Sequence, residues 1–175
     1  MVIGESEIIG RQALAVRSGL KEGPVRTVIK KLREDGYAET NASGCYLTGR
    51  GRGVYDTLQA RLSSFAALEG TKLTIGDYQV AIAVRGGGRS VQSGLEQRDS
   101  AIKLRASGAT TFVIREGHFT VPGGSADSER EFPGNAWAVL RVALRPKNGD
   151  AVVVCGARDE TTAKLGALSA ALSLI

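Results

Sequence analysis

The hydrophobic and polar positions in the first third of the chain follow a helical period in two short segments. From Ile9 to Ser18, apolar residues alternate with basic and polar ones in the spacing of a short amphipathic helix. Gly19 is well placed to end this helix in a left-handed cap. After a turn, Pro24 favours the start of a second helix. That helix carries one apolar stripe at i, i+3, i+4 and i+7, formed by Val25, Val28, Ile29 and Leu32.

A hairpin follows the second helix, which Gly36 ends. Residues 37–40 are predicted as a short strand, residues 41–44 as a turn and residues 45–48 as the returning strand. Thr48 is then the predicted N-cap of a further helix that runs towards Phe65. Two short helices joined by a glycine-containing turn are typical of a helix-turn-helix, and the hairpin would be its wing.

The pattern changes after the polar segment 69–72, which we predict as a domain boundary between residues 1–68 and 73–175. Beyond it, strands and helices alternate. The predicted elements are a strand at 77–85, a helix at 90–105, strands at 110–115 and 118–121, a helix at 129–144, a strand at 151–155 and a helix at 161–174. This β-α-β-β-α-β-α order predicts a two-layer α/β sandwich with its helices on one face of the sheet, and an α+β fold class for the chain.

The composition favours a polyanionic partner and argues against a membrane protein, a secreted protein and a metal-binding protein. The net charge is +5 and the pI about 9.5, which suits nucleic acid. No apolar run is long enough to cross a bilayer, and no signal peptide is recognisable, so we expect no membrane partner and a cytoplasmic protein. The two cysteines lie far apart and there is one histidine, so we expect buried cysteines and no metal site, disulfide framework or cofactor.

The run GPVRTVIKKLREDGYAETNASGCYLTGRGR, residues 23–52, resembles winged helix-turn-helix transcription regulators. It shares with them a recognition helix that ends in Leu-x-x-x-Gly-apolar and a hairpin that leads into Leu-Thr-x-x-Gly. The resemblance implies that double-stranded DNA is the partner. Such domains begin with a further full helix, whereas only seven residues precede Ile8. We therefore expect a first helix that is short, missing or supplied otherwise.

The whole chain resembles a family of uncharacterised archaeal winged-helix proteins. The segments that carry this likeness are residues 84–86, 94–103, 108–111 and 166–168. The second domain is similar to the small α+β domains grouped with the dehydratase/coactivator and GAD folds. This family implies no function for the chain.

The recognition helix and the wing supply the predicted DNA-binding residues. With the apolar stripe facing inward, the outward residues are Arg26, Thr27, Lys30, Lys31 and Arg33. Arg26 is the candidate for reading guanine, and the later cations are candidates for phosphate contacts. Ser43 at the wing tip, with Arg50 and Arg52 after it, would add contacts. The alternative is an ordinary solvated helix face and a plain hairpin.

A glycine-rich loop between a strand and a helix is the candidate site for a small anionic effector. It consists of Arg85, Gly86, Gly87, Gly88, Arg89 and Ser90. Glycines allow a ligand close to the backbone, and amides at a helix start attract anions, but the spacing is not that of a nucleotide-binding motif. Arg98, Thr110 and Arg158 are further ligand-binding candidates, since neighbouring strand ends would bring Thr110 and Arg158 together. The alternative is a plain turn.

Together these patterns predict a DNA-binding transcription regulator with a C-terminal ligand-sensing or dimerisation domain. A homodimer is expected because two-fold symmetry doubles the DNA contacts, and the apolar helix ending at Ile175 is the candidate dimer surface. No catalytic residues are predicted, because no known catalytic motif is present. Two alternatives stay open: a small-molecule enzyme with a fused, autoregulatory winged helix, and a winged helix that serves as a protein-interaction module.

Overall fold

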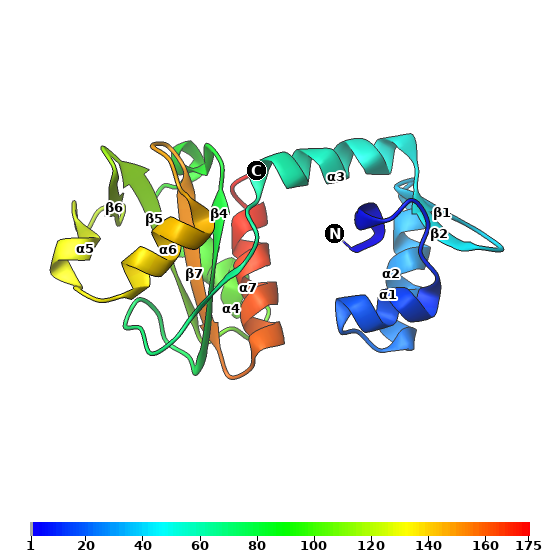
Figure 1. Cartoon of the computed structure of the whole chain (residues 1–175), viewed down its shortest axis with the longest axis horizontal. Helices are drawn as coiled ribbons and strands as arrows, with labels where there is room; N and C mark the ends of the chain where they lie inside the picture. The colour runs from blue at the N-terminus through cyan, green and yellow to red at the C-terminus, as the bar shows by residue number, and fades with distance from the viewer. Residues whose placement is uncertain (1) are drawn as a thin grey trace. The chain divides into compact units, whose positions relative to one another are not determined.

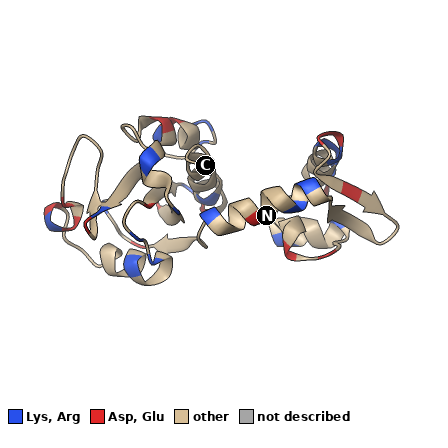
Figure 2. Ribbon diagram, turned by 90° about the horizontal axis from the view of Figure 1, so that it is seen from above, with Lys and Arg blue, Asp and Glu red and all other residues tan. Residues whose placement is uncertain are grey.

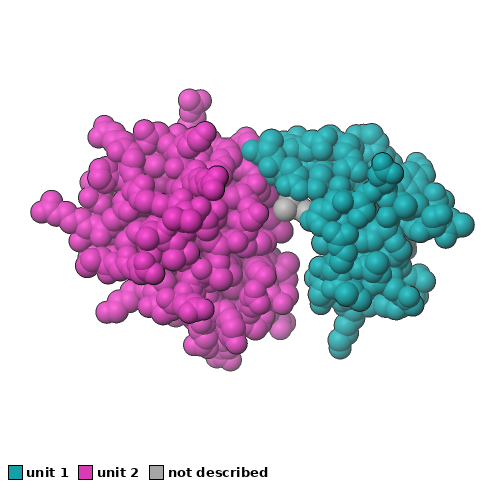
Figure 3. Space-filling model, viewed as in Figure 1, with its two compact units in different colours: residues 1–60 teal, residues 61–175 magenta. Residues whose placement is uncertain are grey.

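The computed structural model describes residues 2–175 and divides into two compact units, residues 1–60 and residues 61–175 (Figure 3). The division lies earlier than the predicted boundary at residues 69–72. The reason is a short strand, β3 (Ala66–Leu68), which pairs with the sheet of the second unit. The segment therefore belongs to the second unit and not, as its sequence pattern predicts, to the first domain.

The first unit contains the predicted helices and hairpin (Figure 1). Its elements are η1 (Val2–Glu5), α1 (Arg11–Ser18), α2 (Glu22–Glu34), β1 (Ala38–Asn41), β2 (Gly44–Leu47) and α3 (Gly49–Arg61). Gly19 ends α1 with a φ of 69°, as predicted. The Thr48 hydroxyl accepts a hydrogen bond from the Gly51 amide at the start of α3 and donates one to the Gly36 carbonyl. This single side chain therefore joins the end of α2 to the start of α3.

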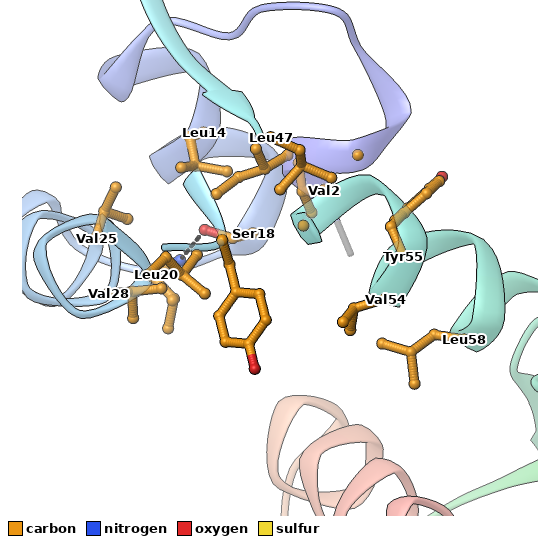
Figure 4. A pocket seen from close by; sticks show the side chains of 15 residues that line it. Val2, Leu14, Ser18, Leu20, Val25, Val28, Leu47, Val54, Tyr55 and Leu58 are labelled. Atoms are coloured by element: carbon orange, nitrogen blue, oxygen red, sulfur yellow. Dashed lines mark hydrogen bonds between the residues drawn. The ribbon is translucent and has the colours of Figure 1, made fainter. Parts of the chain in front are cut away.

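A 3-10 turn, η1, precedes α1, and its Ile3 is buried in the core of this unit. That core is formed by Ile3, Ile9, Leu14, Val25, Ile29, Ala38 and Cys45. Beside it lies an apolar pocket of about 470 Å³, bordered by η1, α1, α2 and α3 (Figure 4). Val28 and Val54 line this pocket and remain about 45% exposed. η1 leaves these two side chains partly exposed.

The second unit is built on a five-stranded sheet in the order β3-β4-β7-β5-β6, in which every neighbouring pair is antiparallel. Its further strands are β4 (Tyr78–Val84), β5 (Gly108–Arg115), β6 (His118–Thr120) and β7 (Ala151–Ala157). Its helices are η2 (Gly87–Ser90), α4 (Leu95–Ile102), α5 (Ser128–Glu131), α6 (Ala136–Leu144) and α7 (Glu160–Leu172).

Helices cover both faces of this sheet, so the predicted arrangement with helices on one face is wrong for α6. Trp137, Leu140 and Leu144 of α6 pack in one core cluster with Phe112 and Val152 of the sheet. Helices α4 and α7 lie on the opposite side (Figure 1). All seven residues of β7 are buried, as expected for a strand covered on both faces.

Two predicted helices are shorter than expected. The predicted helix 129–144 is divided into α5 and α6, because the segment between them contains Pro133, which cannot donate a helical hydrogen bond. The predicted helix 90–105 is regular only in α4, and η2 precedes it. No helix among residues 2–175 combines the length and the apolar character needed to cross a membrane.

Both cysteines are buried, as predicted, and both are free thiols. Burial raises the pKa of the Cys155 thiol to about 11, and burial also raises the pKa of Cys45. Both side chains therefore stay protonated at neutral pH and act as small hydrophobic residues.

Candidate nucleic-acid interface

The outward face of α2 and the β1–β2 hairpin enclose a hollow of about 570 Å³. Val25 and Ile29 turn inward and are buried, which leaves Arg26, Lys30 and Arg33 at the hollow. The charged residues that line it are all basic: Arg11, Arg26, Lys30 and Arg33. Basic residues recur along α2 and α3 (Figure 2). The hollow therefore concentrates positive charge where the predicted recognition helix meets the hairpin.

Arg11 also lines the hollow, although it is not among the DNA-binding residues predicted from the sequence. It is the first residue of α1. A pair of backbone hydrogen bonds between Ile9 and Cys45, both 2.9 Å long, fastens the segment before α1 to β2. This bridge brings Arg11 beside the hairpin. No local sequence signal could reveal the contact, because the two partners are far apart in the chain.

Lys30 and Lys31 are neighbours in sequence but differ in position. Lys30 lines the hollow, and its Nζ is 3.8 Å from a Glu34 carboxylate oxygen. Lys31 does not line the hollow, and it forms an i,i+4 pair with Asp35 at 3.2 Å. The Lys30 side chain is 77% exposed, so its pair with Glu34 is weak and does not prevent a phosphate contact from the hollow.

The hairpin tip has a defined shape and an uncharged surface. The Asn41 side chain accepts hydrogen bonds from the amides of Ser43 and Gly44, at 2.8 and 3.2 Å. Behind the tip, Glu39 accepts a hydrogen bond from the Tyr46 hydroxyl at 2.9 Å and thereby raises the pKa of Tyr46. Thr27 donates its hydroxyl proton to the Gly23 carbonyl. Thr27 is not among the residues that line the hollow, whereas Ser43 is.

Arg50 and Arg52 are engaged within the first unit and do not line the hollow. The Arg50 guanidinium lies 4.6 Å from the centroid of the Tyr37 ring and donates to its hydroxyl. Arg52 donates to the Gly4 carbonyl at 2.7 Å and stacks near Tyr55. Both arginines therefore connect α3 to the rest of the unit, a use that sequence spacing did not reveal.

In the second unit, internal partners hold the predicted anion loop. Arg85 forms an ion pair with Asp150 at 3.0 Å and donates to the Leu144 carbonyl. The Gly86 amide donates to Asp150, and the Gly88 amide donates to the Gly149 carbonyl, both at 2.9 Å. Arg89 and Ser90 are exposed in η2. Several hydrogen-bond donors of this loop that could bind an anion are therefore already paired with acceptors inside the unit.

The antiparallel register separates the predicted ligand residues into two groups. Val84 pairs with Ala151, and Tyr78 pairs with Ala157. Arg85 to Ser90 thus follow one end of β4, whereas Arg158 lies beyond the opposite end, about 20 Å away along the strand. One small ligand cannot contact both groups, so the loop and Arg158 belong to separate candidate sites.

The remaining two candidates have local partners. Thr110 pairs with Val154 at the middle of β7, and its hydroxyl donates to the Leu73 carbonyl at 2.6 Å. Arg98 is exposed on α4 and pairs with its neighbour Asp99 at 3.1 Å. The Thr110 contact holds the loop that contains Leu73, and the Arg98 contact lies on the surface of α4.

One group of side chains with metal-ligand chemistry, formed by His118, Asp127 and Glu129, lies near β6. Their ligand atoms lie within 4.8 Å of one another. The Glu129 carboxylate already accepts two hydrogen bonds from Arg141, at 3.0 and 2.5 Å. His118 Nδ1 is 3.5 Å from an Asp127 oxygen. The Arg141–Glu129 ion pair fastens α6 to α5 and already engages one of the three potential metal ligands.

The chain is similar to a solved archaeal structure, "Hypothetical protein PH0730 from Pyrococcus horikoshii OT3". The two share 26% sequence identity and a TM-score of 0.65, and the match covers 99% of this chain and 88% of that chain. No protein of curated function matches the chain. The likeness of the second unit to GAD and dehydratase/coactivator domains stays a prediction. A family model described as "Domain of unknown function (DUF4443)" matches residues 75–174, more than half of the sequence, and the chain therefore belongs to the DUF4443 family.

Proposed function

We propose that the chain is a DNA-binding transcription regulator whose first unit is a winged helix-turn-helix domain. The observation that carries this proposal is the hollow between α2 and the hairpin, whose charged lining residues are all basic. A helix with an adjacent hairpin and a concentrated positive charge has the shape and the potential to bind duplex DNA.

In this proposal α2, which has 13 residues, lies in the major groove. Arg26 is near its N-terminal end, the part of a recognition helix that reaches base edges, and it would form bidentate hydrogen bonds with guanine. Lys30 and Arg33, further along the same face, would contact phosphates, and Arg11 would contact the backbone from the start of α1. The uncharged tip at Ser43 would lie beside the sugar-phosphate backbone.

The second unit would sense a ligand, hold a dimer together, or both. Helix α7 turns its small residues towards the sheet and α4, including Ala167 and Ala170, which are fully buried. Leu165 and Leu172 stay 45% exposed, one stripe seven residues apart, and Ile175 at the end of the chain is 44% exposed. This exposed apolar stripe supports the C-terminal helix as the dimer surface.

The test is a titration of labelled duplex DNA with the protein, followed by fluorescence anisotropy at several salt concentrations. We expect the logarithm of the affinity to fall linearly with the logarithm of the salt concentration, by about 0.9 per phosphate neutralised. Lys30→Ala should reduce this slope by about one phosphate contact. Arg26→Ala should weaken binding by roughly tenfold or more at sites that contain the guanine, with a smaller effect elsewhere.

Lys31→Ala is the matched control, because Lys31 is on the same helix, carries the same charge and lies outside the hollow. We expect a salt slope close to that of the wild type. Arg11→Ala should behave like Lys30→Ala. A folded wild-type protein that shows no binding to duplex DNA at low salt would contradict the proposal, and so would equal losses from Lys30→Ala and Lys31→Ala.

A further inference from the structure

A cavity of about 490 Å³ lies in the second unit, between two connections that are distant in sequence. One wall is the segment 69–73, which follows β3, and the other is the segment 131–137, which joins α5 to α6. The volume is in the range of small-molecule sites. The loop of residues 85–90 does not contribute to this cavity.

Both walls are held rigidly by contacts within the unit. The Trp137 indole is 5% exposed, packs edge-on against Phe112 at 5.3 Å, and donates its Nε1 hydrogen to the Phe132 carbonyl at 2.7 Å. On the other side, the buried Gln79 amide donates to the carbonyls of Thr71 and Thr74, at 3.0 and 3.2 Å. A ligand would therefore meet a preformed site and would not have to order these loops.

The lining combines aromatic surface with charges of both signs. Phe132, Trp137 and Leu73 line the cavity, and Phe132 is 46% exposed. Three charged residues, Glu69, Lys72 and Glu131, also line the cavity and are exposed. None of the three forms an ion pair within residues 2–175. By contrast, the nearby Glu129 is paired with Arg141.

We infer that this cavity binds a free α-amino acid with an apolar or aromatic side chain. The Lys72 ammonium would pair with the ligand carboxylate, and the carboxylates of Glu69 and Glu131 would pair with its ammonium group. The side chain of the ligand would lie against Phe132 and Trp137. The cavity carries two carboxylates and one ammonium group. A simple anion is disfavoured there, because it has no cationic group to pair with the two carboxylates.

This inference deepens the proposed function, since the amino acid would be the effector of the regulator. Binding to the cavity is nevertheless measured without DNA. Its failure would leave the DNA proposal standing, and a failure of the DNA titration would leave this site standing.

The test uses isothermal titration calorimetry on the full-length protein with L-phenylalanine and L-leucine. Two truncated probes of the first ligand separate its charged groups: phenethylamine lacks the carboxylate, and 3-phenylpropionate lacks the amine. We expect saturable binding of at least one amino acid and binding weaker by roughly tenfold or more for both truncated probes. Lys72→Met and Glu131→Gln should each weaken binding of the amino acid by a similar factor.

Lys103→Met and Glu96→Gln are the matched controls, because both residues are exposed on or beside α4 and do not line the cavity. They should bind as the wild type does. Circular dichroism would establish that every variant is folded. The inference is overturned if folded wild-type protein binds neither amino acid at millimolar concentration, if a truncated probe binds as tightly as L-phenylalanine, or if Lys72→Met and Glu131→Gln bind as the controls do.

Discussion

At Asp150, one buried carboxylate receives hydrogen bonds from three parts of the second unit. The amides of Gly86 and Lys147 donate to it at 2.9 Å, and the Arg85 guanidinium donates at 3.0 Å. Burial by itself raises the pKa of Asp150, but the two amides and the guanidinium outweigh burial and leave the pKa below its ordinary value of 3.8. The fold therefore binds the ionised carboxylate more strongly than the protonated one.

The stability of the second unit should consequently depend on pH through Asp150. Because the pKa in the folded state is lowered, the stabilising contribution is present above the unfolded-state pKa and is lost as the pH falls through the folded-state pKa. We expect Asp150→Asn to lower the free energy of unfolding at pH 7 by about 2 kcal/mol, and to flatten its fall below about pH 4. Urea unfolding over a series of pH values measures both effects.

Asp77→Asn is the control for this prediction, because Asp77 is exposed and accepts no side-chain hydrogen bond from residues 2–175. It should leave the pH profile close to that of the wild type. If Asp150→Asn leaves the pH dependence of the free energy of unfolding unchanged, the loss of stability at acidic pH comes from another carboxylate.

At the scale of elements, α3 begins with three glycines whose surroundings differ. Gly51 is buried, and a Cβ atom there would collide with the Tyr37 carbonyl. Gly53 is exposed, and a Cβ atom there would meet no heavy atom within 4 Å. Gly51 thus allows α3 to pass close to the segment after α2, and Gly53 only adds conformational freedom to the helix.

These two positions predict opposite effects of the same substitution. Gly53→Ala should raise the free energy of unfolding by about 0.5–1 kcal/mol, since alanine loses less backbone entropy in a helix. Gly51→Ala should lower it by about 1–3 kcal/mol, because the backbone must shift to admit the methyl group. Thermal unfolding followed by circular dichroism compares the two variants. Equal shifts of Tm in one direction would exclude this close approach of α3.

For the whole molecule, each unit has a separate hydrophobic core. The core of the first unit is drawn from residues 3–45, and the core around α6 is drawn from residues 66–154. The two clusters have no residue in common. The second unit therefore has a hydrophobic core of its own and should fold without the first.

We therefore expect residues 61–175, expressed alone, to fold cooperatively. In circular dichroism and urea unfolding they should show one sharp transition, and they should not bind DNA, because the basic hollow is absent. The full-length protein provides the comparison under identical conditions. A fragment that binds ANS dye and lacks a cooperative transition would show that the second unit depends on the first.

Local patterns in the sequence determined much of the first unit and most element positions in the second. The helical stripes, the cap at Gly19 and the hairpin turn at residues 41–44 depend on residues that are neighbours in the chain. The positions of β4, β5 and β7 followed from short apolar runs in the same way. The basic face of α2 was also evident from the helical spacing of its cations, although its role in DNA binding stays a proposal.

Only the tertiary structure decided how distant segments meet. The three residues of β3 are too few to show a period, and the face covered by α6 depended on strand order. The bridge from Ile9 to Cys45 placed Arg11 at the hollow, and the antiparallel register set Arg85 and Arg158 at opposite ends of the sheet. The cavity between segments 69–73 and 131–137 likewise requires long-range pairing. Periodicity reports which side of an element is apolar, but it does not identify the element that packs there.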